Sequence, residues 1–317
     1  MKTIFLGTPS PAVPFLKALA ETFPPSLVIT RPDARSGRGQ QLLACPVKEA
    51  ALAAGIATAS PATDEELKAA VAASGAEAAF VVAYGRILRQ DTLSLLPKGF
   101  INIHFSILPK YRGAAPAQWA LINGETETGV SAFRIDNGLD TGPLLGLRKV
   151  AVAREDDAVS LMDKLMASGV ELLLETARAL EDGSAAERPQ SGEASHAPKL
   201  DKALALLDFS RTAEELSNLV RGLQLGPLPY VLCPVRGKPM RVQVLKARPA
   251  QPAPQDVKNP GTGRLVRIER PFGFVVECKH SLLLVETVRP EGKKPMAAAD
   301  FASGFQLGPG AEFVQAG

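Results

Sequence analysis

Short apolar runs alternate with amphipathic segments over the first half of the chain. Apolar runs of strand length occur at residues 3–6, 27–29, 78–83, 101–104 and 130–135. Between them, apolar positions recur at helical spacing in residues 13–22, 47–54, 65–73 and 116–123. Strands that alternate with helices predict a parallel β-sheet covered by helices on both faces. A longer amphipathic stretch at residues 156–180 predicts a helix that closes this domain.

The pattern changes near residue 182. Residues 182–197 are rich in Gly, Ser, Ala and Pro, show no periodicity and predict a linker. An amphipathic stretch at residues 213–223 then precedes β-like runs at residues 231–233, 241–246, 263–268, 273–278 and 281–288. Such spacing is typical of a small β-barrel, and an OB-type fold is the leading candidate. We therefore expect an α/β domain at residues 1–182, a linker at 183–207 and a barrel-like domain at 208–317.

Composition restricts the class of protein. The chain has 317 residues, 46% hydrophobic and 22% charged, which is typical of a folded protein with two domains. No apolar stretch approaches the roughly 20 residues that span a bilayer, and Thr8-Pro9 interrupts the apolar start, so we expect a cytoplasmic protein without a membrane partner. The three cysteines, Cys45, Cys233 and Cys278, are too far apart for a disulfide framework or a Cys-x-x-Cys metal site.

The charge is distributed unevenly. Residues 1–207 contain 21 basic and 23 acidic residues, whereas residues 208–317 contain 15 basic and 10 acidic residues. A basic second half can attract an anionic macromolecule, although a solvated Lys/Arg surface is an equally good interpretation of charge alone.

The first predicted turn excludes several nucleotide ligands. It reads Gly7-Thr8-Pro9-Ser10-Pro11-Ala12, with one glycine and with prolines where backbone N–H groups would contact a pyrophosphate. It also lacks the Gly-Lys-Ser/Thr ending of a phosphate loop. NAD, FAD and ATP are therefore not expected as ligands.

Two polar side chains stand out on an otherwise apolar strand. Asn102 and His104 are two residues apart, so they share one face near the carboxyl end, where α/β proteins bind ligands. A hydrogen-bonded Asn–His pair in the core is the structural alternative. Ser106 lacks the small neighbours of a nucleophile elbow, because Phe105 and Ile107 flank it, and is expected to stabilise the following turn.

A second polar segment, residues 136–143, contains Asp140 between glycines. It does not fit a calcium loop, because Thr141 replaces the required glycine and Leu147 replaces the bidentate Glu. Asp140 either stabilises a turn or places a carboxylate beside His104, where it would raise the proton affinity of the imidazole. Asn, His and Asp without a nucleophile or a metal set suit group transfer between two bound substrates, with the amide as oxyanion donor and the His as proton relay.

These motifs resemble the methionyl-tRNA formyltransferases, a family of folate-dependent enzymes. The resemblance extends over nearly the whole chain and includes Phe5-Leu6-Gly7-Thr8-Pro9, Thr30-Arg31-Pro32-Asp33, Gly37-Arg38-Gly39, Val82-Ala83-Tyr84-Gly85, Asn102-Ile103-His104, Tyr111-Arg112-Gly113-Ala114-Ala115-Pro116, Gly138-Leu139-Asp140-Thr141-Gly142 and Pro290-Glu291-Gly292-Lys293-Lys294. It implies a Rossmann-like parallel-sheet domain followed by a small OB-like β-barrel domain. The implied activity transfers formyl from 10-formyltetrahydrofolate to the α-amino group of methionyl initiator tRNA, without a metal, NAD or ATP.

The resemblance also implies roles for individual residues. Asn102, His104 and Asp140 would be catalytic. Folate would lie against Tyr84, Gly85, Arg86, Ile87, Leu88, Ser106, Leu108, Pro109, Leu139, Thr141 and Gly142. The tRNA would contact Arg31, Arg35, Arg38, Lys293 and Lys294. Phe105 and Arg89 depart from the family pattern, as does the turn at residues 225–229.

Three other functions are compatible with parts of the sequence. A sugar-nucleotide formyltransferase would keep the Asn-His-Asp set but would have less use for the basic segments. A glycinamide-ribotide formyltransferase would end near the close of the first domain. A non-enzymatic RNA-binding protein would explain the basic second half and leave Asn102, His104 and Asp140 without a role.

Overall fold

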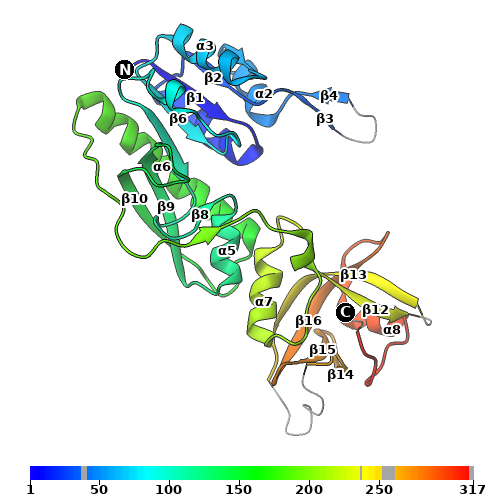
Figure 1. Ribbon diagram of the computed structural model, residues 1–317. Helices are drawn as coiled ribbons and strands as arrows, with labels where there is room; N and C mark the ends of the chain where they lie inside the picture. The colour runs from blue at the N-terminus through cyan, green and yellow to red at the C-terminus, as the bar shows by residue number, and fades with distance from the viewer. Residues whose placement is uncertain (37–40, 236–237, 252–260, 314–317) are drawn as a thin grey trace. The chain divides into compact units, whose positions relative to one another are not determined.

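The protein forms two compact units. A computed structural model describes residues 1–36, 41–235, 238–251 and 261–313 (Figure 1). The first unit comprises Met1–Pro116, Glu127–Ala151 and Asp163–Ala197, and the second comprises Ala117–Thr126, Val152–Met162 and Pro198–Gly317. Among the described helices, none is long and apolar enough to cross a membrane.

A seven-stranded sheet organises the first unit. Its strand order is β10-β9-β7-β6-β1-β2-β5, with bounds Leu144–Ala151, Glu127–Arg134, Phe100–His104, Ala78–Val82, Thr3–Gly7, Leu27–Ile29 and Thr58–Ala59. The five strands from β5 to β7 are parallel and confirm the predicted Rossmann-like class. Strand β9 is antiparallel to β7, and β10 is antiparallel to β9. The prediction of an all-parallel sheet was wrong for residues 130–135, because a local apolar pattern does not encode strand direction.

Four helices connect the parallel strands: α1 (Val13–Thr22), α2 (Pro46–Ala53), α3 (Asp64–Ser74) and α4 (Gln90–Leu93), with a 3-10 turn, η1 (Ser10–Ala12), before α1. Helix α5 (Pro116–Ile122) precedes the antiparallel strand β9, and α6 (Ala158–Asp182) follows β10. All of these helices except α4 lie where the sequence predicted one. The Thr63 side chain caps α3 by accepting a hydrogen bond from the Glu66 N–H. A buried cluster that includes Ile4, Leu67 and Val81 extends to Tyr84 and Leu88, so the loop that follows β6 is anchored in the core.

The second unit is a curled antiparallel sheet, in agreement with the predicted barrel-like class. The strand order is β12-β13-β16-β15-β14, and β17 pairs with β16; the bounds are Tyr230–Val235, Lys238–Pro249, Ser281–Pro290, Gly273–Cys278, Leu265–Glu269 and Met296–Ala297. Helix α7 (Ala213–Gly222) begins with a capping box between Thr212 and Glu215, and α8 (Ala298–Gly304) follows β17. Phe274 stacks on Phe313 in the core.

The segment predicted as a linker is irregular but makes fixed contacts with the first unit. Its strand β11 (His196–Ala197) pairs in parallel with β8 (Arg112–Gly113). A bridge also joins Arg188 to Leu144. A short 3-10 turn, η2 (Lys202–Ala205), follows in the second unit. The boundaries at residues 182 and 208 stay a prediction.

Candidate active site

A cleft of about 490 Å³ opens in the first unit, beside the ends of β6 and β7. Its walls are the loop at residues 83–88 after β6, the end of β7, residues 113, 114 and 116, Phe133 of β9, and residues 135–140 between β9 and β10. Parallel α/β sheets bind their ligands at this end of the strands. Asn102, His104 and Asp140 all line the cleft, so the structure brings the three predicted catalytic residues together.

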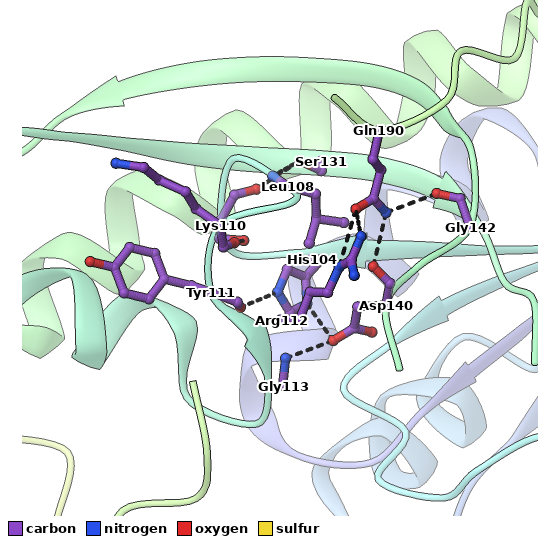
Figure 2. Close-up of polar contacts among 11 residues, drawn as sticks. His104, Leu108, Lys110, Tyr111, Arg112, Gly113, Ser131, Asp140, Gly142 and Gln190 are labelled. Atoms are coloured by element: carbon purple, nitrogen blue, oxygen red, sulfur yellow. Dashed lines mark hydrogen bonds and ion pairs between the residues drawn. The ribbon is translucent and has the colours of Figure 1, made fainter. Parts of the chain in front are cut away.

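His104 is held by one ring nitrogen. Its Nε2 atom lies 2.9 Å from the Tyr111 carbonyl oxygen, and its Nδ1 atom lies 3.6 Å from Asp140 Oδ2 (Figure 2). A carbonyl oxygen only accepts hydrogen bonds, so Nε2 must carry a proton and donate it. Nδ1 is therefore the nitrogen that can accept a further proton, on the side that faces the Asp140 carboxylate.

Burial and charge act on His104 in opposite directions. The side chain is 6% exposed, and burial lowers the pKa of the imidazole because it disfavours the charged form. The Asp140 carboxylate and the Tyr111 carbonyl raise the pKa, but burial has the larger effect. His104 is thus neutral at neutral pH, and its Nδ1 is ready to act as a base.

Asp140 is fixed by backbone contacts. The Gly113 N–H donates to Asp140 Oδ2 at 2.8 Å. Asp136 Oδ1 accepts hydrogen bonds from the Gly138 N–H at 3.0 Å and from the Thr141 hydroxyl at 2.7 Å, which shapes the loop. Asp140 has a left-handed backbone conformation with φ 54°, an uncommon geometry for a residue with a side chain. Ala83 and Tyr111, which also lie beside the site, have φ of 49° and 61°. Strained backbone of this kind clusters at functional sites.

The Asn102 amide is available to a ligand. Asn102 is partly exposed in the cleft wall, where its neighbour across the sheet is Phe133. Among the described residues, no hydrogen bond engages its side chain. The structural alternative, a hydrogen-bonded Asn–His core pair, therefore does not describe this strand, and both side chains of the pair open onto the cleft.

The residues predicted to contact folate fall into two groups. Tyr84, Gly85, Arg86, Ile87, Leu88 and Leu139 line the cleft. In the described chain, the other five are not part of its wall: Ser106, Leu108, Pro109, Thr141 and Gly142. Ser106 is buried, and its hydroxyl donates to the Lys110 carbonyl at 2.6 Å, as expected for a residue that stabilises a turn. The Ser131 hydroxyl accepts from the Leu108 N–H and donates to the Ser106 carbonyl, which fixes the same turn.

Residues predicted to contact tRNA occur in both units. Arg31 is exposed, and its methylene and guanidinium atoms lie within 4 Å of a Cβ built on Gly85. Arg35 lies in a short hairpin of β3 (Ala34–Ser36) and β4 (Gln41–Leu43). Arg38 lies outside the described residues. Lys293 and Lys294 are exposed in the second unit, and Lys293 Nζ lies 5.1 Å from the Phe305 ring centroid.

Sequence reasoning missed three groups that hold His104 and Asp140 or the loop between β9 and β10. They are the Tyr111 carbonyl, the Gly113 N–H and the Gln190 side chain, which contacts the backbone on both sides of Thr141. Backbone contacts leave no side-chain signal in a sequence. Gln190 lies 50 residues from Asp140, in a segment without periodicity. Phe105 also lines the cleft, and its ring packs 6.0 Å from that of Phe15.

Comparison with known proteins gives a consistent family. A model of formyl transferase matches residues 1–177, and a model of the formyl transferase C-terminal domain matches residues 199–306. The methionyl-tRNA formyltransferase of Elusimicrobium minutum is 39% identical over 98% of both chains. That of Thermus thermophilus is 42% identical over 99% of this chain and 100% of the relative.

A solved structure shares the fold at lower identity. The N-formyltransferase of Helicobacter canadensis, in complex with folinic acid and dTDP-3-aminofucose, is 18% identical and superposes with a TM-score of 0.67 over 90% of this chain and 98% of that chain. The present chain belongs to the formyl transferase family and is an enzyme of that class. Its full-length curated relatives are methionyl-tRNA formyltransferases.

Proposed function

We propose that this enzyme transfers the formyl group of 10-formyltetrahydrofolate to the α-amino group of methionyl initiator tRNA, in the cytoplasm, as a step toward translation initiation. The observation that carries the proposal is the near-full-length similarity to methionyl-tRNA formyltransferases, combined with a cleft that contains Asn102, His104 and Asp140. Over the second unit this similarity extends to the formyl transferase C-terminal domain.

The site chemistry supports transfer of a formyl group to an amine. The amine nitrogen attacks the formyl carbon, and the formyl oxygen becomes negatively charged. The free amide of Asn102 can donate a hydrogen bond to this oxygen. The neutral Nδ1 of His104 can accept the proton that the amine loses, and the Asp140 carboxylate stabilises the resulting imidazolium. When the bond from the formyl carbon to N10 breaks, the same proton can return to the folate nitrogen.

The cleft wall suits the aromatic part of folate. Ile87 is 85% exposed and Leu139 is 60% exposed, although both side chains are apolar and line the cleft. Covering such side chains with a planar ring removes apolar surface from water and stabilises the complex. Arg86, which lines the cleft, donates hydrogen bonds to the Asp64 carboxylate and to the Pro61 carbonyl. The Helicobacter relative was solved with folinic acid, itself a formylated folate, which is consistent with this role.

The acceptor is tested by offering the enzyme several amines. Purified protein is incubated with 10-formyltetrahydrofolate labelled in the formyl group and with methionyl initiator tRNA, methionyl elongator tRNA or a dTDP-amino sugar. We expect label on initiator methionyl-tRNA and little on the other two. Efficient transfer to the sugar amine, or none to tRNA, would contradict the proposal.

We also propose that basic residues of both units contact tRNA phosphates. Each lost contact should lower the slope of log affinity against log salt by about 0.7 to 0.9. Lys293→Ala and Lys294→Ala, measured by filter binding at several salt concentrations, should each reduce the slope, as should Arg38→Ala. The apparent KM for the folate should stay nearly unchanged. An unaltered slope in a variant would remove that residue from the tRNA interface.

A further inference from the structure

The Gln190 side chain uses both ends of its amide within the first unit. Nε2 donates to the Asp140 carbonyl at 2.8 Å and to the Gly142 carbonyl at 2.9 Å (Figure 2). Oε1 accepts from Arg112 Nη2 at 2.6 Å and from Arg112 Nε at 3.2 Å. The amide orientation is fixed by chemistry, because carbonyls require the NH₂ group and the guanidinium requires the oxygen.

Gln190 thereby joins the two backbone segments that hold the catalytic pair. One is the loop between β9 and β10, which carries Asp140. The other runs through β8, where the Tyr111 carbonyl accepts from His104 Nε2 and the Gly113 N–H donates to Asp140 Oδ2. The side chain therefore ties the segment that fixes the imidazole to the loop that carries the carboxylate.

The chain on either side of Gln190 is itself anchored. Arg188 and Leu144 exchange two backbone hydrogen bonds, of 2.7 Å and 2.9 Å. On the other side, the Tyr111 N–H donates to the Ser195 hydroxyl at 2.9 Å. A Cβ on Gly113, which has φ 125°, would lie 2.6 Å from the Ala197 carbonyl oxygen, so only glycine permits this close approach. The backbone that carries Gln190 is therefore held in place on both sides.

We propose that Gln190 is a positioning residue, which sets the placement of the Asp140 carboxylate relative to His104. The 3.6 Å separation of Nδ1 and Oδ2 is longer than a hydrogen bond, so the influence of Asp140 on the imidazole depends on how its loop is held. Misplacing a reacting group by about 1 Å can lower a rate by about 100-fold. The consequence for turnover rests on the proposed formyl transfer, whereas the consequence for His104 titration does not.

Titration of His104 tests the proposal without any substrate. The chain has three histidines, so the His104 signals can be followed individually in an NMR titration. Asp140→Asn should lower the His104 pKa, because it removes a charge that raises it. In a Gln190→Met background, which keeps the side-chain length but lacks the amide, the same substitution should shift the pKa by less than half as much. An undiminished shift would overturn the proposal.

Turnover provides a second test, in which kcat and KM of the folded variants are compared. Gln190→Met and Gln190→Glu should lower kcat by about 10- to 100-fold and change either KM by less than about threefold. Gln190→Glu keeps the shape but sets a carboxylate against two carbonyls, so normal activity in this variant would overturn the proposal. The double variant Gln190→Met, Asp140→Asn should have nearly the same kcat as Asp140→Asn alone. Additive losses in kcat would contradict the proposal that Gln190 acts through Asp140. Ser191→Ala, at an exposed neighbouring position, is the matched control and should behave as wild type.

Discussion

Two acid–base pairs in the described part of the chain, each with one buried member, differ in the lengths of their contacts. In the second unit, Glu277 is fully buried, and Arg264 donates to its Oε2 from Nη2 at 2.9 Å and from Nε at 3.0 Å. In the first unit, His104 and Asp140 remain 3.6 Å apart and line an open cleft. The first pair has normal hydrogen-bond lengths, and the second does not.

This difference distinguishes a pair that stabilises the fold, Arg264–Glu277, from a pair that is suited to proton transfer, His104–Asp140. A guanidinium that donates two hydrogen bonds to a fully buried carboxylate stabilises the fold of the second unit, and breaking such a pair is costly. His104 lies between burial, which lowers its pKa, and Asp140, which raises it. A change in the cleft that alters either influence therefore shifts the pKa of His104. Perturbed pairs in clefts are typical of functional sites.

The largest expected effect concerns the cleft. His104→Ala and Asn102→Ala should each lower turnover by about 100- to 10,000-fold, the range for loss of an acid–base group or an oxyanion donor. Both variants should fold normally, which circular dichroism checks; His104→Ala also loses the hydrogen bond to the Tyr111 carbonyl. Formyl transfer is measured under single-turnover conditions. A variant that keeps more than about a tenth of the wild-type rate would not have lost a catalytic group.

In the second unit we expect the opposite outcome, a substitution that lowers folding stability. Arg264→Ala should lower the free energy of unfolding by about 3 to 5 kcal/mol, the range for breaking a buried ion pair, because it removes two hydrogen bonds to the fully buried Glu277 carboxylate. Denaturant unfolding followed by circular dichroism measures the change. Lys246→Ala is the control: Lys246 is 72% exposed and lies 3.5 Å from Glu286, so its loss should cost less than about 1 kcal/mol. Equal losses of unfolding free energy in the two variants would contradict a structural role for the Arg264–Glu277 pair.

The sequence predicted the side chains of the cleft better than the groups that hold them. Asn102 and His104 could be found because a strand places alternate residues on one face. Asp140 was found through its glycine-framed loop and the family resemblance. The direction of β9 and the contacts of Tyr111 and Gln190 could not be predicted, because they depend on backbone pairing and on residues far apart in the chain. Strand β10 was also missed, since none of its residues is buried and its apolar pattern is weak.

A smaller effect should distinguish the two roles of Asp140. Asp140→Asn should lower turnover by about 10- to 100-fold, because the amide stabilises a protonated His104 less well than a carboxylate does. In wild type, activity that requires neutral His104 should persist below the ordinary histidine pKa of 6.5, since burial lowers the pKa. Without the Asp140 charge the pKa falls further, so the acid limb of the pH–rate profile should move to lower pH. A profile that superimposes on that of wild type would exclude Asp140 from the mechanism.

The most direct test of the assigned site is a crystal structure of the enzyme with a stable analogue of 10-formyltetrahydrofolate. We expect the folate ring against the loop at residues 83–88, with the formyl oxygen about 3 Å from the Asn102 amide nitrogen and on the Nδ1 side of His104. An analogue bound outside this cleft, or one whose formyl group points away from both side chains, would contradict the account.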